Sequence, residues 1–129
     1  MVKTLAKTNI FEIWEGNDSI IHIVFSKLFN VDEENAKDYA EVCLKLETKK
    51  RLIMVDLREV ENMSIIALKK MFDPRLVDIT KASAIVVAMN KPFVSIGISF
   101  LLKLGGSPYP LEIFTDEIKA VEWLMQNKD

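Results

Sequence analysis

Three stretches of the chain are short runs of mostly apolar residues. They span residues 52–57, 84–89 and 111–114. The first two are almost continuously apolar, and this pattern predicts strands that are covered on both faces of a sheet. The third run is shorter and predicts a last strand near the carboxyl end.

Near the amino end the pattern changes to partial alternation of apolar and polar residues. It covers residues 10–14 and resumes, rich in β-branched side chains, over residues 19–25. Gly16, Asn17 and Asp18 separate the two stretches and are typical turn residues. The pattern therefore predicts an antiparallel hairpin.

Apolar residues recur at helical spacing after each of three capping residues, Asp32, Ser64 and Thr115. Acidic residues follow the first and the last of them, where the helix dipole favours negative charge. Pro74 predicts a further short helix that ends at Ile79. The predicted buried faces are Ala36, Tyr39, Ala40, Cys43 and Leu46 of the first helix, Ile65, Leu68, Met71 and Phe72 of the second, and Ile118, Val121, Leu124 and Met125 of the last.

The elements follow one another in the order ββαβαβαβα. Strands that alternate with helices predict parallel pairing and right-handed crossovers. We therefore expect one α/β domain over residues 1–129, wound as a sequential β–α superhelix. Its sheet is predicted to have about five strands, mostly parallel, with an antiparallel first strand.

Residues 91–104 carry more apolar side chains than one helix face needs. If the segment is helical, Phe93, Ile96, Phe100 and Leu104 form one stripe, while a second stripe and Leu101 add to the surplus. The surplus predicts burial against the same domain, a homodimer interface, or an apolar pocket for a lipid or other small molecule. A membrane anchor ranks last among these alternatives, because Lys91 and Lys103 are its basic residues.

Composition excludes several classes of function. The formal net charge is −2 and no basic stripe stands out, which argues against nucleic acid. Cys43 and His22 are single residues of their kind, so we expect no disulfide, metal site, cofactor or catalytic constellation. No stretch has the length of a signal peptide or a membrane span, and a cytoplasmic location is expected.

Polar residues gather where two predicted strands end. Asp56 and Arg58 follow one strand, and Asn90 follows the next. In open α/β sheets ligand sites lie at the carboxyl ends of strands, so these residues could form a polar rim for a ligand or partner. The alternative is a solvated loop in which Asp56 accepts backbone hydrogen bonds.

The strand, loop and helix over residues 51–68 resemble the STAS superfamily, which has the anti-sigma-factor-antagonist fold. The positions that match the family pattern are Asp56, Leu57, Val60, Met63 and Leu68. Residues 114–124 are similar to a SpoIIAA-like branch that is close to the CRAL-TRIO lipid carriers. The resemblance implies the superhelical fold and a binding role, or, through that branch, an apolar ligand.

The same segment departs from the family at the helix start. Ser64 stands in place of the family's aspartate, Ile65 and Ile66 in place of its two serines, and Ala67 in place of its glycine. An isoleucine cannot accept phosphate, so the phosphorylation switch that the family implies is expected to be absent. Ser64 is predicted to cap the helix, with phosphorylation of Ser64 as the alternative.

Two functions follow as expectations. The first is a non-enzymatic binding domain that recognises a protein partner at residues 58–67 and 90–97 by shape and apolar contact. The second is a carrier of an apolar small molecule or lipid, with Phe93, Ile96, Phe100 and Leu101 lining the cavity. A homodimer through the surplus apolar surface is compatible with both.

Overall fold

The computed structural model describes residues 3–27, 30–46, 49–90, 92–105, 107 and 109–128, apart from the side chains at positions 92, 93, 95, 100 and 104. The elements along the chain are β1 (Lys3–Lys7), β2 (Phe11–Glu15), β3 (Ile21–Phe25), α1 (Glu33–Leu46), β4 (Arg51–Asp56), α2 (Ile65–Met71), the 3₁₀ helix η1 (Pro74–Asp78), β5 (Thr80–Val86), α3 (Pro92–Gly105), β6 (Leu111–Phe114) and α4 (Glu117–Gln126).

The sheet follows the chain, with the strands in the order β1-β2-β3-β4-β5-β6. β1, β2 and β3 are antiparallel neighbours, and the pairs from β3 to β6 are parallel. The predicted α/β class and hairpin are therefore confirmed. The sheet has one strand more than expected, because β1 is short and carries lysines at both ends, a composition that suits an exposed sheet edge.

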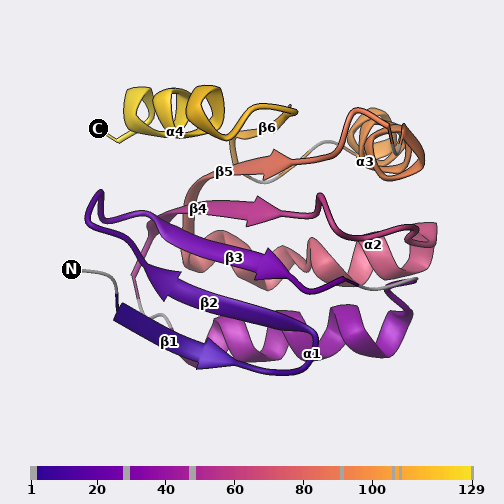
Figure 1. Ribbon diagram of the computed structural model, residues 1–129, viewed down its shortest axis with the longest axis horizontal. Helices are drawn as coiled ribbons and strands as arrows, with labels where there is room; N and C mark the ends of the chain where they lie inside the picture. Colours follow the sequence, from indigo (N-terminus) through magenta and orange to yellow (C-terminus); the bar gives the residue numbers. More distant parts are fainter. Residues whose placement is uncertain are drawn as a thin grey trace.

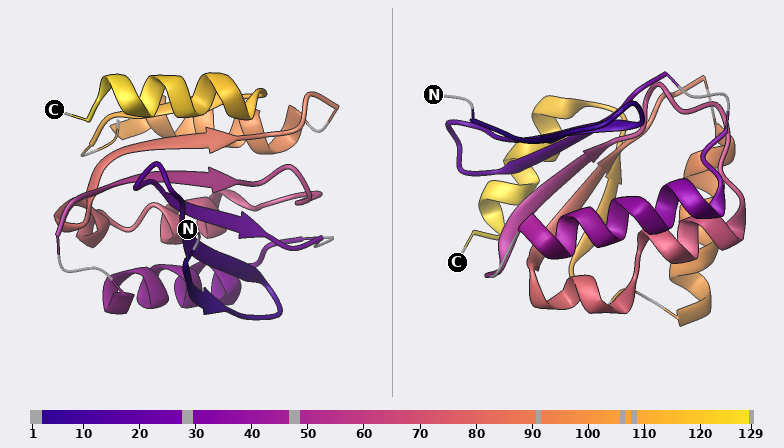
Figure 2. Two further views of the ribbon diagram at one scale, coloured as in Figure 1. Left: turned by 60° about the vertical axis from the view of Figure 1, so that its left-hand side comes forward. Right: turned by 90° about the horizontal axis from the view of Figure 1, so that it is seen from below.

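Helices lie on both faces of the sheet. α1 and α2 pack side by side on one face, while α4 lies on the opposite face over β4, β5 and β6 (Figures 1 and 2). The larger core lies on the α1 and α2 side. The smaller one contains Met54 and Ala84 from the sheet, Ile20 directly before β3, and Ala120 and Leu124 from α4.

The hairpin turn between β2 and β3 is fastened to the sheet. Arg51 of β4 donates to the Ser19 carbonyl oxygen at 3.2 Å and pairs with Glu15 at 2.9 Å. A Cβ on Gly16 would stand 2.9 Å from the His22 Nε2 atom, so the turn needs glycine there. Trp14 and His22 stack across the two strands with an interplanar angle of 5°. These contacts fix the register of the hairpin.

β5 begins and ends earlier than the apolar run predicted. The run at residues 84–89 predicted a strand through Met89, but the strand ends at Val86 and Met89 is 83% exposed. The strand starts directly after η1, where Thr80 pairs with Arg51. Lys81 and Ser83 hid this start in the sequence, because they interrupt the apolar pattern.

The predicted buried face of α4 was partly wrong. Leu124 is buried as expected, but Ile118 is 70% exposed and Met125 is also exposed. Ala120 takes the central buried position, since its small side chain lets the helix approach Ala84 and its neighbours closely. Asp116, one residue after the predicted Thr115, caps the helix by accepting from the Ile118 N–H at 2.8 Å.

Candidate functional site

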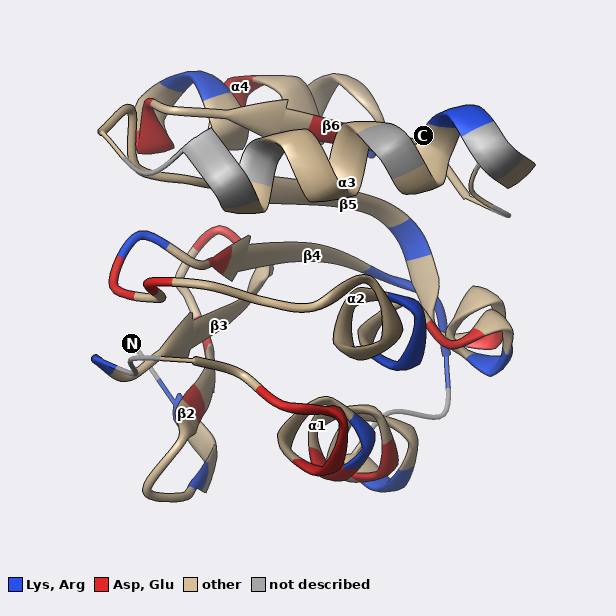
Figure 3. Cartoon of the chain, turned by 90° about the vertical axis from the view of Figure 1, so that its right-hand side faces the viewer, with Lys and Arg blue, Asp and Glu red and all other residues tan. Residues whose placement is uncertain are grey.

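The carboxyl ends of the parallel strands meet at one edge of the sheet. Helices α1, α2 and α3 all begin at this edge, as Figure 3 shows with α3 crossing above the starts of α1 and α2. We call it the carboxyl edge. In open α/β folds this is where binding sites gather, and most of the predicted site residues lie near it.

Ser64 caps α2 at the carboxyl edge, as predicted. Its backbone is extended (φ −72°, ψ 161°), and its hydroxyl oxygen accepts from the Ala67 N–H at 3.0 Å. The hydroxyl therefore satisfies one of the free N–H groups of the first turn. The next two residues, Ile65 and Ile66, are exposed, at 36% and 56%, so the prediction that Ile65 belongs to the buried face of the helix was wrong.

The start of α1 lies directly beside the start of α2. Val31 and Met63 form an isolated parallel bridge, and the Val31 N–H donates to the Asn62 carbonyl oxygen at 2.9 Å. This register brings Asp32 level with Ser64. Asp32 caps α1, since its Oδ1 atom accepts from the Asn35 N–H at 2.8 Å. Two helix starts with their caps thus stand next to each other.

Of the segment that was uncertain from sequence, residues 91–104, the part from Pro92 onward lies within a single helix, α3, and Lys91 lies outside the described residues. Among its described side chains Val94 and Ile98 are buried, whereas Ile96 is 63% exposed. A Cβ on Gly97 would stand 2.7 Å from Cδ1 of Leu68 and 3.9 Å from Cδ1 of Ile65. α3 therefore packs closely on α2, and each helix presents exposed isoleucine at the carboxyl edge.

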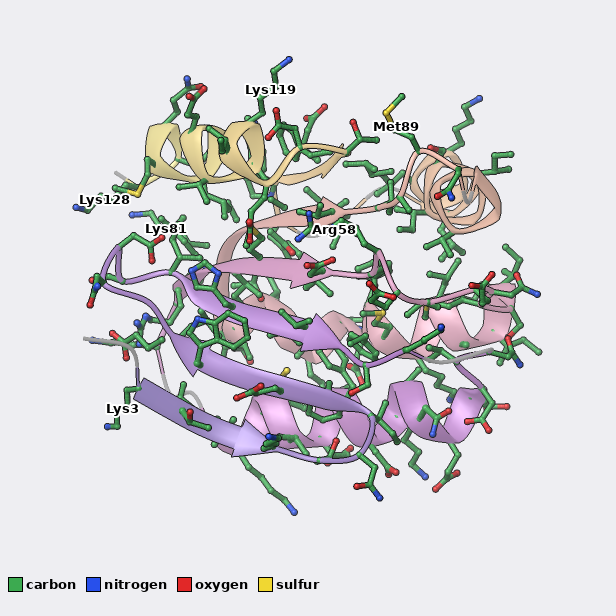
Figure 4. All side chains as sticks on the ribbon, viewed as in Figure 1. Lys3, Arg58, Lys81, Met89, Lys119 and Lys128 are labelled. Atoms are coloured by element: carbon green, nitrogen blue, oxygen red, sulfur yellow. The ribbon has the colours of Figure 1, made fainter. Side chains whose placement is uncertain are left out.

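Asp56 and Arg58 form a closed ion pair on the α4 side of the sheet. Asp56 is buried and accepts from the Arg58 N–H, Nε–H and Nη2–H groups at 3.0, 3.0 and 2.7 Å. Arg58 also reaches Glu117 at 4.0 Å. The hydrogen bonds to Asp56 raise the pKa of Arg58 above its ordinary value. The pair links the end of β4 to the start of α4 (Figure 4).

The structure brings some predicted site residues together and separates others. Ser64, Ile66 and Ile96 share the α2 and α3 side of the carboxyl edge, while Asp56 and Arg58 lie on the other face of the sheet. Asn90 is exposed in the turn before α3. In Figure 4 Met89, the residue before Asn90, lies above α3, whereas α2 lies below α3. Asp56 accepts a backbone hydrogen bond, as the solvated-loop interpretation expected, but it is buried at the end of β4 and not solvated.

Of the four residues predicted to line a lipid cavity, the structure describes the side chains of Ile96, which is exposed, and Leu101. Leu101 is half-buried and packs on the main core, and the side chains of Phe93 and Phe100 lie outside the described residues. An apolar hollow does occur elsewhere, but it encloses only about 10 Å³, which is close to the space of one water molecule. Its lining residues are Leu5, Ile13, Ile21, Ile23, Cys43, Leu46, Ile53 and Ile79.

Burial shifts the pKa of the two tyrosines in the core. Burial raises the pKa of Tyr39 well above its ordinary value, with a smaller contribution from Cys43, and burial also raises that of Tyr109. Cys43 is buried, as predicted. His22 lies on β3, and its Nε2 atom is 3.4 Å from Oδ1 of Asp18. Among the described residues no three His, Cys, Asp or Glu side chains come together to hold a metal.

Sequence reasoning missed the acidic turn beside α2. Asp32, Glu33 and Glu34 were recognised as helix-start residues, but not as neighbours of Ser64. The sequence holds one faint signal that the two helix starts are neighbours. Each capping residue directly follows an apolar residue, Val31 before Asp32 and Met63 before Ser64. An apolar residue at that position often fixes how the chain enters a helix.

Comparison with known proteins places the chain by fold and by family. No described helix is long and apolar enough to cross a membrane. A solved structure from Shewanella loihica PV-4, an uncharacterised protein of the DUF3478 family with a SpoIIAA-like fold, matches with a TM-score of 0.59 and 14% identity, covering 92% of this chain and 98% of that one. A search of curated proteins gives no match.

The likeness to the Shewanella structure shows the fold alone, because the identity is low. The six-stranded mixed sheet with its four α-helices is accordingly a SpoIIAA-like fold. A family model described as a domain of unknown function, DUF7793, matches residues 13–128, from the second strand to the end of the last helix. The chain therefore belongs to the DUF7793 family.

Proposed function

We propose that the protein is a non-enzymatic, STAS-like binding domain that recognises a protein partner at the carboxyl edge. The observation that carries the proposal is the exposure of Ile65, Ile66 and Ile96 on two tightly packed helices at this edge. We call these three residues the isoleucine patch. Large apolar side chains at a rigid surface are typical anchors of protein interfaces.

The STAS-like character rests on fold and motif together. The SpoIIAA-like fold of the Shewanella protein supports it, as do Asp56, Leu57, Val60, Met63 and Leu68 at the family positions of this chain. Ile66 stands where the family usually has its phosphate acceptor. The same surface would therefore serve recognition here, with an apolar side chain in place of the acceptor.

We infer that recognition at this surface runs without a phosphorylation switch. Ser64 is the remaining hydroxyl at the start of α2, and it is already used as a helix cap. The Val31–Met63 bridge sets it beside Asp32 and the acidic first turn of α1. A phosphate on Ser64 would meet these negative charges, and like-charge repulsion opposes such a modification.

The test compares three baits in cell extract from the organism that encodes the protein. The baits are the wild type, Ile66→Ser in the patch, and Ile118→Ser on the exposed side of α4, which removes an exposed isoleucine from the opposite face of the sheet. We expect a partner that the wild type and the Ile118→Ser protein retain and that the Ile66→Ser protein loses. Equal retention by all three baits would contradict the proposal.

A second experiment addresses the switch. The purified protein is incubated with the same extract and ATP, and Ser64 is examined by mass spectrometry. We expect no stoichiometric phosphate on Ser64. Full phosphorylation of that residue would overturn the inference about the switch and leave the docking proposal standing.

A further inference from the structure

We propose that the isoleucine patch docks on the same patch of a second copy of the chain, in a two-fold dimer whose α2 helices run antiparallel. This inference rests on the proposed function, since it names the partner at that site. The observation behind it is the arrangement of charge around the patch. The charges lie in two bands of opposite sign, one at the carboxyl edge and one a helical turn further away.

The first band is acidic and lies at the carboxyl edge itself. It contains the exposed carboxylates of the turn that opens α1, which are Asp32, Glu33 and Glu34. The Val31–Met63 bridge starts α1 and α2 level with each other, and both helices rise equally per residue. The acidic turn therefore stands level with Ile65 and Ile66.

The other charges at this edge leave the band acidic. Glu59, in the loop before α2, is exposed and adds to it, whereas Lys27, which follows β3, opposes it with a single charge. Arg58 is paired with Asp56, and Glu61 has an interaction partner of its own. The edge thus keeps an excess of carboxylates.

The second band is basic and begins on α2. Lys69 and Lys70 are exposed four residues after Ile65 and Ile66, so the lysines share the outer face of those isoleucines. In Figure 3 the helix accordingly opens on tan positions and continues into blue ones, beside the red turn that opens α1. The isoleucines of α2 therefore lie at the boundary between the two bands.

The basic band continues onto α1. Lys37 is exposed one turn after Glu33, at the level of the lysines of α2. Asp38, the next residue, is also exposed and offsets one of these positive charges. Further along, Glu41 is paired with Arg75 at 2.8 Å. The band thus keeps a net positive charge.

The two bands do not neutralise each other within one chain. Among the described residues, the glutamates that open α1 and the two lysines of α2 form no ion pair. Asp73, the carboxylate nearest to Lys70 in effect, is already paired with Arg75 at 2.8 Å. Both bands are therefore open to charges from outside the chain.

The order of the bands identifies the occupant. A partner of one sign, such as a basic peptide or an anionic lipid surface, would be attracted by one band and repelled by the other. A second copy turned by 180° about an axis through the patch presents the same bands in reverse order. The acidic band of each copy then faces the basic band of the other, with the two isoleucine patches in contact between them.

The first experiment measures the mass of the purified full chain by light scattering at micromolar concentration and low salt. Ile66→Ser removes the centre of the contact. Ile118→Ser is the matched control, because it removes an exposed isoleucine from the opposite face of the sheet. We expect a dimer for the wild type and the control, and dimerisation about 10-fold weaker for Ile66→Ser.

Exchange of the charges tests the two-fold arrangement. One variant, Glu33→Lys with Glu34→Lys, reverses the acidic band and keeps the Asp32 cap, while Lys69→Glu with Lys70→Glu reverses the basic band. Each variant alone sets like charges against each other and should dimerise about 10-fold more weakly at low salt. An equal mixture of the two should form a heterodimer, because every band again faces the opposite charge. Recovery in the mixture also shows that both variants are folded.

The control for these reversals is Glu112→Lys with Glu122→Lys, which reverses two exposed carboxylates of β6 and α4 and should leave the dimer intact. A monomeric wild type, a dimer that Ile66→Ser leaves unchanged, or a mixture no more dimeric than its components would overturn this inference. Binding of a monomeric wild type to phosphatidylserine vesicles through Ile66 would assign the patch to a membrane instead.

The bait experiment separates failure of this inference from failure of the docking proposal. If the dimer forms, the untagged chain itself is the partner that the Ile66→Ser bait loses. If the purified chain is monomeric and Ile66→Ser still loses a partner from the extract, the docking proposal stands with a different protein as partner. Equal retention by all baits together with a monomeric chain would remove both.

Discussion

Gly97 of α3 faces Leu68 of α2 so closely that a methyl group on residue 97 would stand 2.7 Å from the Leu68 Cδ1 atom. Leu68 is fully buried, so its side chain has little room to move away. The contact sets how α3 lies on α2, and with it where Ile96 stands relative to Ile65. The arrangement of the isoleucine patch depends on the absence of a side chain at one position.

Gly97→Ala should therefore destabilise the protein although alanine favours a helix. We expect the free energy of unfolding to fall by about 1–3 kcal/mol, as for other overpacked cores. Urea denaturation measures the change. Gly105→Ala is the matched control, because a Cβ there meets nothing within 4 Å. Equal stabilities for the two variants would show that α3 does not need this close approach.

Ser64→Ala should weaken the start of α2 by removing the acceptor for the Ala67 N–H. The expected loss in the free energy of unfolding is about 1 kcal/mol, the usual effect of a lost N-cap. Ser64→Asn should retain most of the stability, because asparagine also caps. A Ser64→Ala protein as stable as the wild type would contradict the capping role.

Ala120→Leu tests the observed face of α4. Ala120 is fully buried over the small residues Ala82 and Ala84, so a larger side chain should cost about 1–3 kcal/mol by overpacking. Ile118→Ala removes a larger side chain from the exposed side, and its effect should stay within about 0.5 kcal/mol. Thermal unfolding of both variants distinguishes this face from the one that the sequence predicted.

The two tyrosines of the chain should resist ionisation in the folded state. Burial raises the pKa of both Tyr39 and Tyr109 above the ordinary value of 10.0. Their contribution to stability is full below pH 10 and is lost as the pH rises through the folded pKa values. Near-ultraviolet absorbance should show no phenolate near pH 10 in buffer, whereas in urea both tyrosines should be about half ionised there. A phenolate signal near pH 10 from the folded protein would refute the burial.

The sequence predicted the elements whose signals are local. Asp32 and Ser64 were correct caps, because a capping side chain bonds to N–H groups a few residues away. Residues 111–114 were a correct strand. β1 was missed, because its lysines carry little apolar pattern and its place depends on pairing with β2. The start of β5 was missed for a similar reason, since pairing with β4 sets it.

The candidate site was predicted only in part, because its main feature joins distant parts of the chain. Ser64 and Ile66 were named from the motif at the start of α2. The acidic turn at Asp32 is more than thirty positions away, and the Val31–Met63 bridge that brings it there has no periodic signal. Asp56 and Arg58 were expected in the same site, yet the pleat of β4 places them on the opposite face.

The strand order also bears on how the protein is made. Because each strand pairs with the strand before it in the chain, every strand that leaves the ribosome finds its neighbour already formed. Mostly local pairings of this kind shorten the search for the native state. A nascent chain that stops after β5 would expose a long apolar strand edge, and only the arrival of β6 and α4 covers it. The arrival of β6 and α4 therefore protects this edge from pairing with another chain.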